Sequence, residues 1–127
     1  LLREKPLDNI VMVTDSLKPT KQRTGTLKAN GMDVAMASDG AFISIKDPDL
    51  FVGSGLTMLQ GLKNVVEWEI PIQQASQMSS TNPARIYGLA KQGMLVPGYK
   101  ADVVVLDQNI QMKGLFIDGN LIRDRFA

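Results

Sequence analysis

The first apolar run of the chain constrains the fold more than any other feature. Ile10 to Val13 is an unbroken stretch of four apolar residues, rich in β-branched side chains, and it lacks the alternating polar residues of a half-exposed strand. Such runs are typical of strands that are buried on both faces, as in a parallel sheet or a barrel. We therefore expect a buried strand at this place, in a chain of the α/β class.

The length of the chain limits how much of such a fold it can supply. With 127 residues it can form one domain with a hydrophobic core. A complete (β/α)8 barrel needs about 250 residues. The first residues, Leu1 to Pro6, contain no initiator Met and do not resemble a signal peptide. We expect the sequence to begin inside a longer protein.

Charge and composition exclude several classes of function. The 14 basic and 13 acidic residues leave a net charge of +1, so we expect no nucleic acid and no membrane as partner. No segment approaches the roughly 20 apolar residues that span a bilayer, and we expect a cytoplasmic protein. The chain contains neither His nor Cys, so a metal held by this chain alone would need oxygen ligands only.

The rest of the chain alternates between strand and helix patterns. Glycines and Asp39-Gly40 divide the stretch from Thr26 to Ile45 into short segments, which predicts a small antiparallel sheet. Apolar residues at helical spacing predict a helix from Leu56 to Glu69, with Thr57 and Gln60 in the form of a capping box. Proline and glycine positions predict two more helices and then strands, over Pro71–Ser80, Asn82–Gly88, Ala101–Leu106, Met112–Ile117 and Asn120–Arg123.

Two places in the sequence are candidates for chemistry. Asp15 directly follows the apolar run, and in α/β barrels the active site lies at the carboxyl ends of the strands. Val52-Gly53-Ser54 forms part of a glycine-bearing loop that leads into a helix, where free N–H groups can bind a ligand. Either place has a structural alternative, since Asp15 could simply end a strand and the loop could simply cap the helix.

Two further motifs have a structural interpretation. Asn82-Pro83-Ala84-Arg85 is predicted to open a short helix, with Asn82 as its cap. Gly98-Tyr99-Lys100-Ala101-Asp102 precedes a strand, and we expect Asp102 to accept hydrogen bonds from nearby backbone N–H groups. We assign no chemistry to either motif.

Taken together and in order, these motifs resemble the C-terminal third of the N-acetylglucosamine-6-phosphate deacetylases, a family of the amidohydrolase superfamily. The resemblance covers essentially the whole chain. Asn-Pro-Ala and Gly-x-x-Ala-Asp are shared widely among amidohydrolases, whereas the Gly-Ser-x-Leu-Thr-Met segment and Asn64 to Glu67 point more narrowly to the deacetylases. The segments that carry the resemblance are Val13–Asp15, Val52–Met58, Asn82–Arg85 and Gly98–Asp102.

The resemblance implies a fold and an activity. The fold is the C-terminal portion of a (β/α)8 barrel plus strands of a small β-sandwich, with residues 1–100 at the end of the catalytic barrel and residues 101–127 in the sandwich. Asn9 to Thr14 would be the last barrel strand, and the helix from Leu56 to Glu69 would pack outside the barrel. The family removes the acetyl group from its phosphorylated amino sugar, giving glucosamine 6-phosphate and acetate.

The resemblance also implies roles for residues. Asp15 would be the general base and acid that takes a proton from a metal-activated water and passes it to the departing amine. Val52, Gly53 and Ser54 would line the bound sugar, mostly through backbone groups. The family's ligands for its divalent metal ion, zinc or iron, are a Glu and two His from earlier strands. Because this chain has no His, we expect no bound metal and no activity from it alone.

Other interpretations stay open at this point. The chain could belong to another amidohydrolase, such as an adenine deaminase or a dihydroorotase-like enzyme. It could also be a non-catalytic β-rich module, although a buried strand at Ile10 to Val13 argues against that. An exposed apolar strand would favour pairing with a second copy, so we also expect a homo-oligomer.

Overall fold

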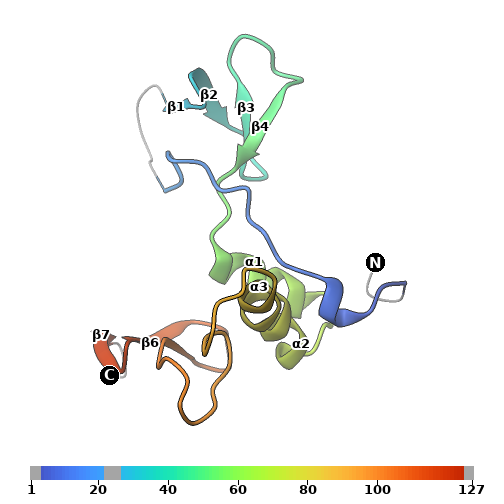
Figure 1. Cartoon of the computed structure of the whole chain (residues 1–127). Helices are drawn as coiled ribbons and strands as arrows, with labels where there is room; N and C mark the ends of the chain where they lie inside the picture. The colour runs from blue at the N-terminus through green and yellow to red at the C-terminus, as the bar shows by residue number, and fades with distance from the viewer. Residues whose placement is uncertain (1–3, 22–26, 125–127) are drawn as a thin grey trace. The chain divides into compact units, whose positions relative to one another are not determined.

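A computed structural model of the chain describes residues 4–21 and 27–124 (Figure 1). Thr26, where the predicted small sheet was expected to begin, lies outside the described residues. The chain divides into two compact units, which are described separately below. The smaller unit is Val13–Gly61, and the larger unit combines Leu1–Met12 with Leu62–Ala127. The predicted division at residue 100 concerns the barrel and sandwich of a longer protein and stays a prediction.

The smaller unit contains the predicted antiparallel sheet. Its four strands follow one another in the order β1-β2-β3-β4. Asn30 and Gly31 connect the first two strands with φ angles of 51° and 77°, the pair of left-handed conformations that a tight type I′ hairpin requires. A core of Ala29, Val34 and Phe42 lies on one side of this sheet. The strands are β1 (Leu27–Ala29), β2 (Met32–Met36), β3 (Ala41–Ser44) and β4 (Phe51–Ser54).

The last strand of this sheet corrects one prediction. Val52, Gly53 and Ser54 were expected in a loop, but they belong to β4, which pairs with β3. A glycine inside an apolar segment was a misleading signal, because Gly53 is needed here for close packing rather than for a turn. Residues 55–57 then lead from β4 into the first helix.

The predicted buried strand at Ile10 to Val13 is wrong in this structure. The blue segment after the short 3-10 helix η1 (Leu7–Asn9) runs extended without forming a strand (Figure 1). Ile10 is buried, whereas Val13 is 78% exposed. Apolar side chains predict burial, but a strand also needs the edge of a neighbouring strand for its N–H and C=O groups. Within the described residues, the strand-like pairing nearest to this segment is one parallel bridge between Ser16 and Ser54.

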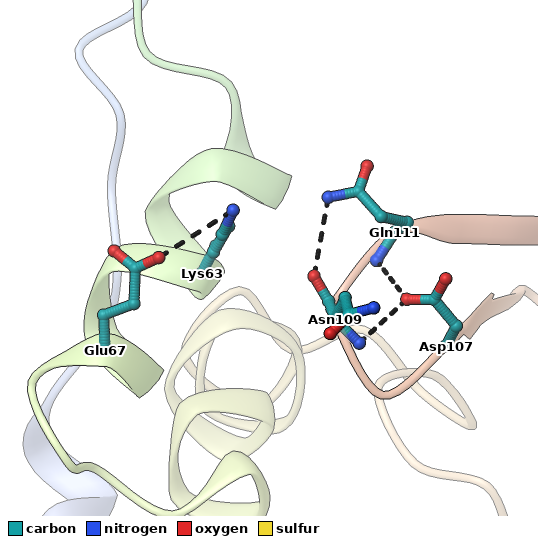
Figure 2. A network of polar contacts seen from close by, with 5 residues as sticks. All are labelled: Lys63, Glu67, Asp107, Asn109 and Gln111. Atoms are coloured by element: carbon teal, nitrogen blue, oxygen red, sulfur yellow. Dashed lines mark hydrogen bonds and ion pairs between the residues drawn. The ribbon is translucent and has the colours of Figure 1, made fainter.

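The strongest predicted helix is confirmed as α1 (Met58–Glu67). Thr57 Oγ1 accepts a hydrogen bond of 3.3 Å from the N–H of Gln60, as the capping pattern predicted. Lys63 and Glu67 form an ion pair across one turn, with 3.8 Å between Nζ and Oε1 (Figure 2).

Three short helical segments of the larger unit follow one another without a break. They are α2 (Ile72–Ser76), the wide π-turn η2 (Gln77–Thr81) and α3 (Asn82–Ile86). The prediction that Asn82 caps a separate helix is therefore wrong, because both Thr81 and Asn82 have helical φ and ψ angles. Pro83 lacks an N–H and cannot complete a regular α-helical ladder, and the wider turn before it accommodates this.

The side chain of Asn82 does not cap a helix but forms hydrogen bonds with backbone carbonyls near the start of the chain. It is 1% exposed, and its Nδ2 donates to the carbonyls of Leu7 and Ile10 at 2.8 and 2.7 Å. Arg85 donates to the carbonyl of Asp8. The motif thus fixes η1 and the residue that follows it onto the helix, which confirms its structural interpretation.

The predicted C-terminal strands form an antiparallel sheet in the order β5-β6-β7. Asp118 and Gly119 connect the last two strands with φ angles of 49° and 78°, again a type I′ hairpin. In the turn between the first two strands, the Asp107 carboxylate accepts hydrogen bonds from the N–H groups of Asn109 and Gln111 (Figure 2). The strands are β5 (Val103–Leu106), β6 (Met112–Ile117) and β7 (Asn120–Asp124).

Asp102 stabilises this sheet as the sequence predicted. Its Oδ1 accepts a hydrogen bond of 2.9 Å from the N–H of Asp118. Lys100 lies 3.3 Å from both carboxylates. The N–H of Asp118 lowers the pKa of Asp102, and the side-chain hydrogen bonds to Asp102 and Asp118 raise the pKa of Lys100. All three groups are exposed, so they orient the hairpin more than they stabilise it.

Across residues 4–21 and 27–124, no helix combines the length and the apolar character that crossing a bilayer requires.

Replacing Asn82 by Ala should lower the free energy of unfolding of the larger unit by roughly 2–4 kcal/mol, because two carbonyl groups lose their hydrogen-bond donors away from water. Asn109→Ala is the matched control, since Asn109 lies exposed in a turn of the same unit. Urea unfolding followed by circular dichroism measures both variants. Equal stability of the two variants would contradict a structural role for Asn82.

Candidate functional site

The segment around Asp15 lies along the end of strand β4, within the smaller unit. The N–H of Ser54 donates to the carbonyl of Asp15 at 2.8 Å, and the N–H of Leu17 donates to the carbonyl of Ser54 at 3.0 Å. The hydroxyl of Ser54 donates to the carbonyl of Thr14. These bonds join two parts of the chain that the sequence separates by about forty residues, and they bring the predicted site residues together.

Asp15 has an unusual backbone and a free side chain. Its φ angle is 49°, in the left-handed region that few residues other than glycine adopt. The side chain is exposed, and no group among the described residues forms a hydrogen bond or ion pair with its carboxylate. Non-glycine residues held in such a conformation cluster at functional sites, because the surrounding structure must over-determine them.

Val52, Gly53 and Ser54 differ in what they contact. Val52 is half-buried and packs against the core of the sheet. Gly53 is buried beneath Leu17, and a Cβ atom at Gly53 would lie only 2.7 Å from Leu17 Cγ. The absence of a side chain at Gly53 thus allows the segment after Asp15 to lie directly on β4.

Ser54 uses its polar groups within the chain. Its hydroxyl donates to Thr14 and accepts a 3.1 Å hydrogen bond from the N–H of Leu56. Its carbonyl also accepts from the hydroxyl of Thr20, at 3.4 Å. The family resemblance implied that Ser54 lines the bound sugar. These contacts could not be predicted from the sequence, because no local signal reveals a partner so far along the chain.

The residues of this chain do not fit a metal centre. His and Cys are absent from the sequence. Among the described residues, no group of three or more acidic side chains lies close enough together to hold an ion. What the arrangement offers is one exposed carboxylate, that of Asp15, on a backbone position that is held by hydrogen bonds on both sides.

The family model described as "Amidohydrolase family" matches residues 7–113. The chain therefore belongs to the amidohydrolase family. Its relatives include an N-acetylglucosamine-6-phosphate deacetylase of Vibrio furnissii, which is 31% identical over 123 residues, 91% of this chain. An adenine deaminase of Methanothermobacter thermautotrophicus is 36% identical over 107 residues, covering 81% of this chain and 19% of that protein.

Solved structures agree with this assignment. The N-acetylglucosamine-6-phosphate deacetylase of Thermotoga maritima superposes with a TM-score of 0.85 and 26% identity, over 96% of this chain. The predicted resemblance to these deacetylases is thus confirmed. This chain spans 29% of the Vibrio furnissii protein and 33% of the Thermotoga maritima chain.

Replacing Gly53 by Ala should destabilise the smaller unit by about 1–3 kcal/mol, the usual cost of forcing an extra group into a packed place. The added Cβ would displace Leu17, which lies above Gly53. Adding Leu17→Ala should recover part of the loss, because it removes the atoms that collide. Thermal unfolding of the two single variants and the double variant measures this coupling. Strict additivity would mean that Gly53 and Leu17 do not compete for the same space.

Proposed function

We propose that the whole protein is a metal-dependent amidohydrolase that removes the acetyl group from N-acetylglucosamine 6-phosphate. This chain would be its C-terminal part, with the end of a (β/α)8 barrel and strands of a small β-sandwich. The observation that carries the proposal is the exposed Asp15 carboxylate, held at the end of β4 in a left-handed conformation. The deacetylases of Vibrio furnissii and Thermotoga maritima support the choice of substrate.

Asp15 would act as general base and general acid in turn. Its carboxylate takes a proton from the attacking water while the water oxygen bonds to the amide carbon. When the C–N bond breaks, Asp15 gives that proton to the departing nitrogen, and acetate and the free amine are formed. Its exposure and the absence of a competing partner among the described groups leave the carboxylate available for both transfers.

The divalent metal ion of the whole protein, zinc or iron, would be held by residues outside this chain. That follows from the chemistry of the donors, since the sequence has neither His nor Cys. Val52 and Gly53 would form a wall of the sugar site through backbone groups, next to Asp15. Ser54 lies next to this wall, and its hydrogen-bonding groups are directed at the chain itself.

Adenine deamination is the second candidate function. It is favoured by the identity of 36% to the adenine deaminase of Methanothermobacter thermautotrophicus. Both reactions break a carbon–nitrogen bond with water, and both could use Asp15 for proton transfer. Acetate release from the sugar phosphate and ammonia release from adenine distinguish the two directly.

We propose a homo-oligomer only as a secondary feature of this chain. The expectation assumed an exposed apolar strand at Ile10 to Val13. Ile10 is buried and only Val13 of this run is largely exposed, so the surface available for pairing is smaller than expected.

In the whole protein, Asp15→Asn should lower kcat by roughly a thousandfold, because the amide that replaces the carboxylate cannot carry the proton. Folding and metal content should stay nearly unchanged. Steady-state acetate release, with metal analysis of the same samples, measures the effect. A variant that keeps more than about a tenth of the original kcat would reduce Asp15 to a structural residue.

The 127-residue chain alone should release no acetate from N-acetylglucosamine 6-phosphate, and calorimetric titration with Zn²⁺ should show no tight stoichiometric binding. The reason is the lack of His and Cys ligands. Turnover by this chain, in a preparation free of host deacetylase, would overturn the proposal that the remaining residues of a longer enzyme are required.

A further inference from the structure

Ser54 has contacts with both peptide groups that flank the side chain of Asp15. Its hydroxyl donates to the carbonyl of Thr14, which precedes Asp15. Its backbone N–H donates to the carbonyl of Asp15 itself, at 2.8 Å. One residue therefore fixes the peptide plane on each side of the carboxylate-bearing Cα.

These contacts hold a conformation that Asp15 would not favour by itself. A φ angle of 49° is unfavourable for a residue with a side chain. A free chain would leave this conformation, and the carboxylate would then point in another direction. The hydrogen bonds to Ser54 offset that cost and fix the direction in which the Cα–Cβ bond of Asp15 leaves the backbone.

The hydroxyl of Ser54 has little capacity left for a ligand. A serine hydroxyl has one hydrogen to donate, and Ser54 gives it to Thr14. It also accepts from the N–H of Leu56, at the point where the chain leaves β4 for α1. The carbonyl of Ser54 is occupied by Leu17 and Thr20.

We propose that Ser54 is a positioning residue, which acts on the reaction through Asp15 rather than by contacting the substrate. The proposal rests on the proposed function, because it assumes that Asp15 transfers the proton. A displacement of a reacting group by about 1 Å can lower a rate by about a hundredfold. Loss of the Ser54 hydroxyl should therefore reduce the rate of the chemical step more than substrate binding.

Ser54→Ala in the whole, metal-loaded protein tests this directly. We expect kcat to fall by roughly tenfold to a hundredfold, with KM within about twofold of the original value. Ser54→Thr keeps the hydroxyl and should restore most of kcat. Ser44→Ala is the matched control, since the hydroxyl of Ser44, a residue of β3, accepts a hydrogen bond from the N–H of Asp47 in the connection between β3 and β4, away from Asp15.

A second measurement separates positioning from loss of fold. In the 127-residue chain, the coupling constant between the N–H and Hα of Asp15 reports its φ angle, and it should move away from the left-handed value in Ser54→Ala only. If Ser54→Ala does not fold, Ser54→Thr and Ser54→Cys replace it. The kcat of Ser54→Thr should then exceed that of Ser54→Cys, because a hydroxyl is a stronger hydrogen-bond donor than a thiol.

The outcomes are distinguishable. An unchanged kcat in Ser54→Ala, together with a strong loss in Asp15→Asn, would overturn the positioning role and leave the proposed function intact. A raised KM with unchanged kcat would show that Ser54 contacts the substrate. If Asp15→Asn also leaves kcat unchanged, the proposed role of Asp15 in proton transfer fails, and the positioning role of Ser54 fails with it.

Discussion

The hydrogen bonds between Ser54 and the Thr14–Asp15 segment are the interaction on which the candidate site depends. They join the end of β4 to a segment that has no regular structure of its own. Backbone groups in an extended segment need partners, and Ser54 supplies them to Thr14, Asp15 and Leu17 where a neighbouring strand would otherwise do so. Gly53 makes this approach possible, because any side chain there would meet Leu17.

In the larger unit, the buried side-chain amide of Asn82 likewise provides hydrogen bonds to backbone groups of another segment. Asn82 donates to the carbonyl of Leu7 in η1 and to that of Ile10 directly after it, and it directly follows the wide turn that precedes Pro83. In both units a polar group from a regular element fixes an irregular segment. The two places differ in exposure. Asn82 is almost fully buried, whereas Asp15, in the segment that Ser54 holds, is exposed and must stay so if it is to exchange protons with a substrate.

Local signals predicted much of the secondary structure. Asp118-Gly119 predicted the turn between β6 and β7, and Thr57 with Gln60 predicted the start of α1. Both predictions were correct because turns and caps depend on residues within a few positions of one another. Predictions failed where distant contacts decide. Ile10 to Val13 has the composition of a buried strand, but no strand among residues 4–21 and 27–124 pairs with it. Asn82 has the sequence context of a cap but binds a segment more than seventy residues away.

The sequence by itself determined the family, the hairpins and the candidate carboxylate, because motifs in order and short-range turn chemistry can be recognised along one dimension. It also shows that this chain offers neither His nor Cys as a metal ligand. Only the tertiary structure decided that Val52–Ser54 is a strand and that Ser54 bonds to both sides of Asp15. The physical reason is that a hydrogen bond depends on distance in space. The sequence does not show that an Asp and a Ser about forty positions apart lie close together in the fold.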